Sequence, residues 1–156
     1  MPPERAFIVE PGRCNCTALR KASRRMSQFY DAALAPSGLR GTQFAILVDL
    51  ARRGDAPPTI RELSEAMALD QSTIGQNLRP LEREGLIGLV QDEADRRSRR
   101  IQLTKAGRAR FFEARPLWLA AQEQFEASFG KRAAAELRSV LATVVSDPSL
   151  AAASND

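Results

Sequence analysis

Residues 59–104 read TIRELSEAMALDQSTIGQNLRPLEREGLIGLVQDEADRRSRRIQLT, and this stretch decides the fold. Thr59 and Glu62 have the spacing of a capping box, in which two side chains satisfy each other's free backbone donors. Apolar residues follow at steps of three and four, so we expect a short helix over residues 60–68. Asp70 is a favourable N-cap for a second helix. Two short helices around a tight turn form a helix-turn-helix.

Two β-capable runs follow Gly85, a residue suited to end the second helix. The first run covers residues 86–91, and the second, residues 99–104, alternates apolar and polar side chains. The charged residues 92–98 lie between them. The sequence therefore predicts a β-hairpin that forms a wing beside the helix-turn-helix.

Amphipathic helices are predicted on both sides of this unit. Before it, apolar residues between about 15 and 35 recur at helical spacing, and another helix begins near Thr42. After it, Thr104 can cap a long helix that reaches about residue 129. Pro116 is expected to bend this helix, because proline removes a backbone donor. A last helix follows.

The predicted fold is mainly α with a small β-hairpin wing: a winged helix-turn-helix flanked by N- and C-terminal dimerisation helices. We expect a flexible arm at 1–12, one domain at 13–147 and a disordered tail at 148–156. Within the domain, the winged unit covers 42–104 and the dimerisation helices cover 13–36 and 105–147. The aromatic stripe of the C-terminal helices needs a partner surface, supplied by a second chain or by a bundle within one chain: Phe111, Trp118, Phe125 and Phe129.

Composition excludes several function classes. The 156 residues include no histidine, which excludes Ser-His-Asp and Cys-His catalysis and histidine-ligated zinc. Carboxylate or lysine catalysis stays open, but the pairs Glu62/Glu65 and Glu82/Asp92 lie where capping or solvated roles are usual. We therefore expect no enzyme, no catalytic residue, no metal and no cofactor.

Location follows from the same composition. No run of 18 apolar residues is present, so no membrane span or membrane partner is expected. The chain has two cysteines and lacks the apolar run of a secretory signal at its start. A cytoplasmic location is the expectation.

Charge and polar residues point to a polyanionic partner. The net charge is +4, and residues 96–110 hold seven basic residues and no acid. Amides can bond adenine and arginine can bond guanine, so the second helix of the helix-turn-helix offers a base-reading face: Gln71, Ser72, Thr73, Gln76, Asn77 and Arg79. Pro80 should loosen this helix near Gln76. On the wing, acids can order the loop while an arginine enters a minor groove: Asp95, Arg96, Arg97 and Arg99.

The stretch 42–107 resembles the MarR-type transcriptional regulators. The resemblance rests on the wing pattern Asp92-x-x-Asp95-Arg96-Arg97-Ser98 and on the pattern Leu103-Thr104-x-x-Gly107 that ends the stretch. The segments 63–67 and 78–87 also match. It implies a homodimer with one recognition helix and one wing per half-site, and release from DNA by phenolic or aromatic acids or by thiol oxidation. It also implies that Asp95 orders the wing and that Arg97 or Arg96 enters the minor groove.

An effector pocket is predicted between the helical layer and the winged unit. Aromatic and apolar side chains are available there, with Arg20 or Arg24 to pair a carboxylate: Phe29, Tyr30, Phe44, Leu47, Phe111 and Trp118. Plain core packing is the alternative role for the aromatic residues.

Cys14 and Cys16 stand at the start of the first long helix and are not part of the family pattern. The helix dipole favours a thiolate there, so one of them is a candidate redox site. Helical spacing predicts that Cys16 is the more buried and Cys14 the more exposed. Two inert thiols are the alternative.

Together these features predict a sequence-specific DNA-binding transcriptional regulator, a repressor in our expectation. It would act as a homodimer on an inverted repeat in double-stranded DNA, released by a small aromatic acid or by thiol oxidation. The alternative is a winged-helix module that binds protein or RNA.

Overall fold

The computed structural model describes residues 12–151. Its elements are α1 (Asn15–Leu34), the 3-10 helix η2 (Ala35–Ser37), α2 (Gly41–Arg53), α3 (Ile60–Met67), α4 (Gln71–Arg83), β1 (Ile87–Gln91), β2 (Arg99–Leu103), α5 (Lys105–Phe129), α6 (Lys131–Ser146) and the 3-10 helix η3 (Pro148–Leu150). The chain is mainly helical with a single two-stranded antiparallel hairpin among the described residues, so the predicted fold class is confirmed.

The sequence predicts a flexible arm at the start of the chain and a disordered tail at its end. Residues 1–11 of the predicted arm and 152–156 of the predicted tail lie outside the described residues. Residues 148–150 of that tail form η3 instead, because the Asp147 carboxylate accepts hydrogen bonds from the backbone N–H and the hydroxyl of Ser149. No helix in residues 12–151 has the length and apolar character needed to cross a membrane.

The helix-turn-helix forms because its local signals agree. Thr59 and Glu62 make the predicted capping box at the start of α3. The Asp70 carboxylate accepts the backbone N–H of Thr73 at 2.8 Å and caps α4. Gly85 follows α4 with a positive φ of 69°, as the sequence predicts for the end of this helix. α4 runs through Pro80 as one continuous helix.

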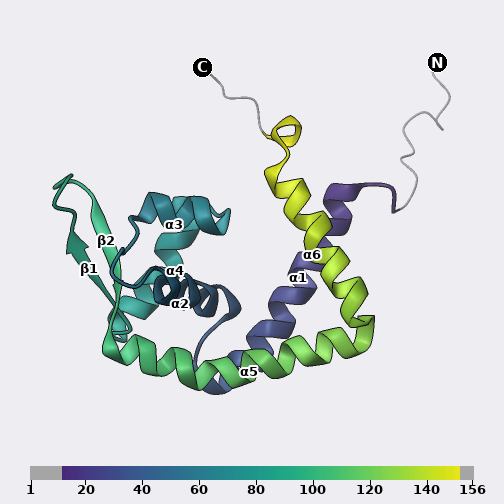
Figure 1. Ribbon diagram of the computed structural model, residues 1–156, viewed down its shortest axis with the longest axis horizontal. Helices are drawn as coiled ribbons and strands as arrows, with labels where there is room; N and C mark the ends of the chain where they lie inside the picture. Colours follow the sequence, from purple (N-terminus) through teal and green to yellow (C-terminus); the bar gives the residue numbers. More distant parts are fainter. Residues whose placement is uncertain (1–11, 152–156) are drawn as a thin grey trace, which may run out of the picture.

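The wing is fastened to the rest of the winged unit. Ile87 pairs with Leu103, and Gln91 pairs with Arg99 at the far end of the hairpin. Ile101 is fully buried, and its backbone N–H donates to the carbonyl of Pro58 at 2.8 Å. The base of the wing therefore joins the start of α3, while the tip extends freely into solvent (Figure 1).

α5 links the winged unit to the other helices. Figure 1 shows it along the base as one long, gently bowed helix that Pro116 does not interrupt, with the winged unit at one end and α1 and α6 at the other. At its start, the Thr104 hydroxyl donates to the carbonyl of Gly85 at 2.6 Å. The Thr104 backbone N–H donates to the carbonyl of Leu86 at 3.2 Å. The start of α5 is thus bonded to the loop between α4 and β1.

The predicted aromatic stripe divides into two halves. Phe111 and Trp118 both stack on Phe44 of α2, with ring centroids 5.8 and 6.0 Å away. They pack on the core of their own chain, so the partner surface of this half of the stripe lies within the chain. Phe125 and Phe129 stack on each other, and Phe129 stays 64% exposed.

Candidate nucleic-acid interface

The outer face of α4 carries the first group of candidate DNA contacts. Ile74, Leu78 and Leu81 are buried against the winged unit. Ser72, Gln76 and Arg79 are exposed and, at about 100° per residue, lie on the opposite side of the helix. Gln71 is exposed at the N-terminus. These four side chains form the exposed polar face of α4, which is suited to contact base edges.

Thr73 also belongs to the predicted set, but its hydroxyl is committed to the helix cap. It donates to the Asp70 carboxylate at 2.6 Å. Hydrogen bonds from the Thr73 side chain and backbone hold the pKa of Asp70 below its usual range. The Thr73 methyl group and the acceptor lone pairs of its hydroxyl oxygen are left for a base contact.

Asn77 does not face outward with the exposed polar residues. It is half-buried on the flank of α4, and its Nδ2 donates to the carbonyl oxygen of Thr73 at 2.9 Å. It lines a cavity on the side of α4 that faces Met67 and Leu69. Asn77 thus lies a quarter turn nearer to the buried row than the exposed polar residues, and its direct base contact stays a prediction that this geometry does not favour.

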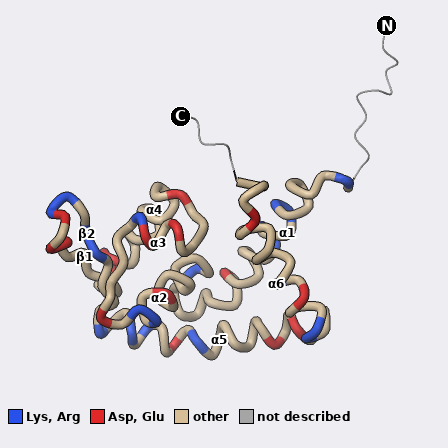
Figure 2. The backbone as a smooth tube through the Cα atoms, turned by 45° about the horizontal axis from the view of Figure 1, so that its top comes forward, with Lys and Arg blue, Asp and Glu red and all other residues tan. Residues whose placement is uncertain are grey.

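The wing tip carries the second group. The Asp95 carboxylate accepts the backbone N–H of Arg97 at 2.9 Å, and the Asp95 carbonyl accepts the N–H of Ser98 at 2.9 Å. Asp95 thus orders the tip through backbone bonds. Arg96, Arg97 and Arg99 are exposed and form no ion pair with any described residue. Figure 2 shows this basic tip extending beyond the acidic residues of the hairpin.

Arg100 fastens the wing and was missed among the sequence candidates. Its Nη2 lies 3.0 Å from Asp92 Oδ2, and its Nη1 lies 3.6 Å from Glu62 Oε2. Nη1 also donates to the carbonyl of Pro57 at 2.8 Å. The Arg100 guanidinium holds the pKa of Asp92 below its usual range. The Asp92–Arg100 ion pair therefore lies where the loop meets the strands, and the arginines of the tip form no ion pair within residues 12–151.

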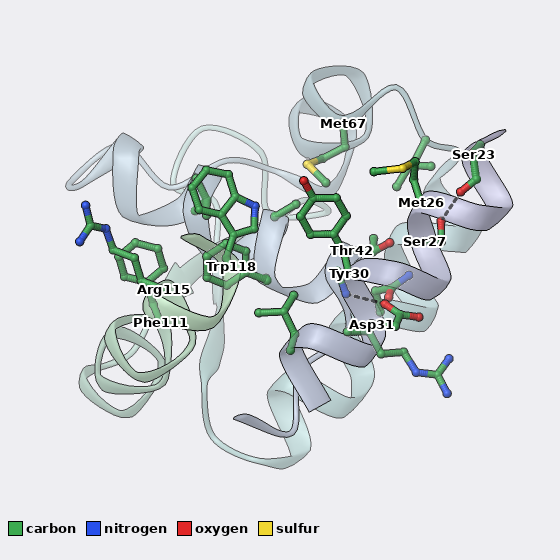
Figure 3. Close-up of a pocket in the computed structure, with 18 residues that line it drawn as sticks. Ser23, Met26, Ser27, Tyr30, Asp31, Thr42, Met67, Phe111, Arg115 and Trp118 are labelled. Atoms are coloured by element: carbon green, nitrogen blue, oxygen red, sulfur yellow. Dashed lines mark hydrogen bonds between the residues drawn. The ribbon is translucent and has the colours of Figure 1, made fainter. Parts of the chain in front are cut away.

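A cavity of about 870 Å³ lies beside this interface, between α1, α2, α5 and the turn before α4. Four of the predicted effector residues line it: Tyr30, Phe44, Phe111 and Trp118. Figure 3 shows Trp118 and Phe111 entering from α5 and Met26 and Ser27 from α1, with Tyr30 between them and Met67 across the opening. This cavity is concave, mostly apolar and aromatic, as small-molecule sites commonly are.

The other predicted effector residues do not line the cavity. Phe29 directly precedes Tyr30 on α1, but its side chain borders a smaller groove together with Phe125 and Phe129. Leu47 is fully buried inside the winged unit, and its neighbour Val48 lines the cavity instead. Arg20 and Arg24 are exposed on α1 and are not among the residues that line the cavity.

Apart from Tyr30, the sequence does not predict the polar residues that line the cavity. Arg40 and Arg115 line it, and Figure 3 shows the Arg115 guanidinium turned away from the aromatic rings. Tyr30 donates its hydroxyl to Gln122 Oε1, and burial raises the pKa of this hydroxyl. Asp31 accepts the backbone N–H of Gly41 at 2.7 Å, which joins α1 to the start of α2. Because the Arg115 guanidinium points away from the rings, Arg40, which is exposed, is the other cation that the described lining offers to a ligand carboxylate.

The two cysteines lie at the start of α1. Cys14 is the N-cap, and its Sγ accepts the backbone N–H of Thr17 at 3.4 Å. Hydrogen bonds from Thr17 lower the pKa of Cys14. Both thiols are free and exposed in the single chain, and the predicted order of their burial, with Cys16 the more buried, stays a prediction.

Known proteins share this architecture. Residues 39–98 match the MarR family. The HTH-type transcriptional repressor NicR of Pseudomonas putida is 34% identical over 91 residues, which cover 58% of this chain and 56% of NicR. The match thus spans little more than half the length of this curated relative.

Solved structures match over more of the chain. The M. tuberculosis transcriptional regulator MosR, in complex with DNA, has a TM-score of 0.75 and 35% identity, covering 85% of this chain and 93% of MosR. The transcriptional repressor CouR, from Rhodococcus jostii, bound to a 23-mer DNA duplex, has a TM-score of 0.74 and 26% identity, covering 84% and 92%. With this winged unit and these relatives, the chain belongs to the MarR family of DNA-binding transcriptional regulators.

Proposed function

We propose that this regulator is a homodimeric repressor that binds an inverted repeat and is released by a small aromatic carboxylate. The observation that carries the DNA-binding part is the combination of an exposed polar face on α4 with three arginines at the ordered wing tip that form no ion pair with any residue that the structure describes. A helix of this kind suits the major groove, and free guanidinium groups suit a narrow minor groove. A protein-binding module would have little use for both.

Dimerisation is supported by apolar surface at the far end of α5 and along α6. The large exposed hydrophobic residues there are Phe129, Leu137, Val140, Leu141, Val144 and Val145. A contiguous apolar surface of this kind usually marks an interface. A two-fold dimer would place its recognition helices in successive major grooves on one face of the DNA, about 34 Å apart.

The aromatic ligand is supported by the cavity. Trp118, Phe111 and Phe44 offer stacking surfaces, and Arg40 offers a cation at the edge. A planar carboxylate would use both features. Repression in particular is supported by the names of the relatives, since NicR and CouR are both described as transcriptional repressors.

A second means of release, thiol oxidation, is favoured by Cys14. This thiol is exposed, and its lowered pKa increases the thiolate fraction that reacts with oxidants. Cys14 and Cys16 diverge along the helix start, so a disulfide between partner chains would need less distortion than one within a chain. Peroxide treatment followed by a non-reducing gel separates this means of release from the ligand.

The decisive experiment is footprinting on the DNA upstream of the chain's own gene, with sedimentation of the free protein. We expect a two-fold symmetric footprint with half-sites about 10 base pairs apart, and a dimer at micromolar concentration. A single asymmetric half-site or a monomer would contradict the dimer. Binding to RNA or to protein, without salt-dependent binding to duplex DNA, would support the alternative module.

A further inference from the structure

Asn77 joins the cavity to the DNA-facing end of α4. It lines the cavity beside Met67 and Leu69. Its Nδ2 donates to the Thr73 carbonyl at 2.9 Å, and the Thr73 hydroxyl donates to the Asp70 carboxylate at 2.6 Å. A chain of hydrogen bonds therefore runs from the cavity to the cap of the recognition helix.

The turn that Asn77 bridges, residues 73–77, is followed by a weak part of α4. Pro80 has no backbone N–H, so the carbonyl of Gln76 lacks its helical donor four residues on. Gly75 adds conformational freedom within the bridged turn. The part of α4 after this turn is held by buried leucines, whereas the part before it bears the exposed Ser72 and Gln76. The Asn77 side chain therefore stabilises the end of α4 that faces DNA.

Asn77 also has an atom available to a ligand. No described residue hydrogen-bonds its Oδ1, so only Nδ2 is engaged. A phenolic hydroxyl is suited to both atoms of the amide, because it donates to Oδ1 and accepts from Nδ2. Nδ2 carries two N–H groups, so the Thr73 carbonyl loses its donor only when the amide turns to meet the hydroxyl with Oδ1 and Nδ2 together, and this turn is the step that the inference requires.

We propose that Asn77 is the residue through which a hydroxy-substituted aromatic acid in the cavity releases the protein from DNA. The inference rests on the proposed function, since it concerns how the aromatic carboxylate acts there. The carboxylate occupies the Arg40 edge, and the hydroxyl takes the Asn77 amide. The first turns of α4 then loosen and operator affinity falls. An aromatic acid without the hydroxyl fills the cavity but leaves the bond from Asn77 to Thr73 intact.

The test compares 4-hydroxybenzoate with benzoate on the full chain and its footprinted operator. Fluorescence of Trp118, the single tryptophan, reports occupancy, and hydrogen exchange of residues 71–77 reports the state of α4. For the wild type we expect both acids to quench Trp118. Only 4-hydroxybenzoate should speed exchange and weaken operator binding, by about tenfold or more.

Two variants separate the proposed role from general damage. Asn77→Leu should still be quenched by 4-hydroxybenzoate, should bind every operator sequence more weakly than the wild type, and should respond to the acid by less than about twofold. Met67→Leu, a neighbouring cavity residue without a hydrogen bond to α4, should respond like the wild type. Full release of Asn77→Leu by 4-hydroxybenzoate would overturn the proposal. So would a lost preference at one operator base pair, which would show that Asn77 reads a base.

Failure of the ligand class is distinguishable from failure of this inference. If neither acid quenches Trp118, the aromatic carboxylate of the proposed function is wrong, and variants of the ligand-free chain carry the test. Asn77→Leu should then speed hydrogen exchange of residues 71–77 and weaken operator binding, whereas Ala45→Phe, which fills the cavity without a hydroxyl, should change neither. Unchanged exchange and affinity in Asn77→Leu would overturn the role of Asn77.

Discussion

Gly107 of α5 lies directly against the backbone carbonyl of Leu86, so closely that a Cβ on residue 107 would overlap that oxygen. The Thr104 hydroxyl, which accepts the Gly107 N–H at 3.0 Å, fixes the same turn of α5. The Leu-Thr-x-x-Gly pattern is therefore a close-packed joint between α5 and the winged unit.

Gly107→Ala should destabilise the chain by about 1–3 kcal/mol, the usual cost of overpacking a buried contact. The backbone of Leu86 cannot yield without disturbing β1, which begins at the next residue. Urea denaturation followed by circular dichroism measures the change in unfolding free energy. An unchanged free energy of unfolding would contradict the close packing of Gly107 against the Leu86 carbonyl.

Gly75→Ala is the matched control for this substitution. Gly75 also lies inside a helix, but nothing stands within 4 Å of a Cβ built there. Alanine should therefore raise the unfolding free energy by about 0.5–1 kcal/mol through helix propensity alone.

Arg97→Ala should weaken binding to all duplex sequences and lower the slope of log affinity against log salt by about one, because one phosphate contact is lost. If the guanidinium occupies a narrow minor groove, the loss is largest on A·T-rich flanks. Arg132→Ala, which removes an exposed arginine from α6, is the control and should leave the slope unchanged. Fluorescence anisotropy over a salt series measures both.

In the Asp92→Asn variant, the free energy of unfolding should fall less steeply with decreasing pH than in the wild type. The folded pKa of Asp92 lies below its unfolded value, so the carboxylate stabilises the fold above the ordinary pKa of about 4, and this stabilisation disappears as the pH falls toward the folded value. The variant lacks this contribution at neutral pH and therefore melts at a lower temperature there. Thermal melts between about pH 7 and pH 2.5 check both effects. Asp55→Asn, in the exposed loop before α3, should change neither.

Arg40→Ala should raise the dissociation constant of benzoate by about tenfold, the loss expected for one charge-assisted hydrogen bond. Arg20→Ala removes an equal charge outside the cavity and should leave binding unchanged. Quenching of Trp118 fluorescence gives both constants. Equal losses would point to a general effect of positive charge on α1 and α2.

Cys14 should be alkylated by iodoacetamide at pH 7 faster than Cys16, because its lowered pKa gives more thiolate while both thiols are exposed. Mass spectrometry over time on the wild type, with Cys14→Ser and Cys16→Ser to assign the peptides, measures the two rates. Equal alkylation rates would contradict the prediction that the N-cap position makes Cys14 more reactive than Cys16.

Local rules predicted most of the fold. The capping residues Thr59, Asp70 and Thr104 act through bonds to neighbours three residues away, so their pattern is visible in the sequence. The same is true of the hairpin, where alternation placed Ile101 on the buried face. Asp95 could also be predicted, because it orders the wing through its own loop.

Residues whose roles depend on distant elements could not be predicted in this way. Helical spacing places Asn77 beside the buried row of α4, but it does not reveal that α3 and α5 leave a cavity there. Arg100 meets Asp92 across the hairpin, and Glu62 on α3 joins them only after the wing has folded back. Arg40 lines the cavity and Arg20 does not, because α1 meets the start of α2 near Asp31 and Gly41, which the sequence pattern does not show.

The bonded joint at Thr104 makes α5 a lever arm. Its 25 residues span about 37 Å at 1.5 Å each, with the winged unit fixed at one end. A tilt of about 5° at the other end therefore carries the winged unit through about 3 Å, close to one base-pair step. In a two-fold dimer both units move, so the separation of the recognition helices changes by up to about 6 Å against half-sites that DNA holds at a fixed pitch. Small changes where the helices of two chains pack can thus be amplified into a loss of register with the operator.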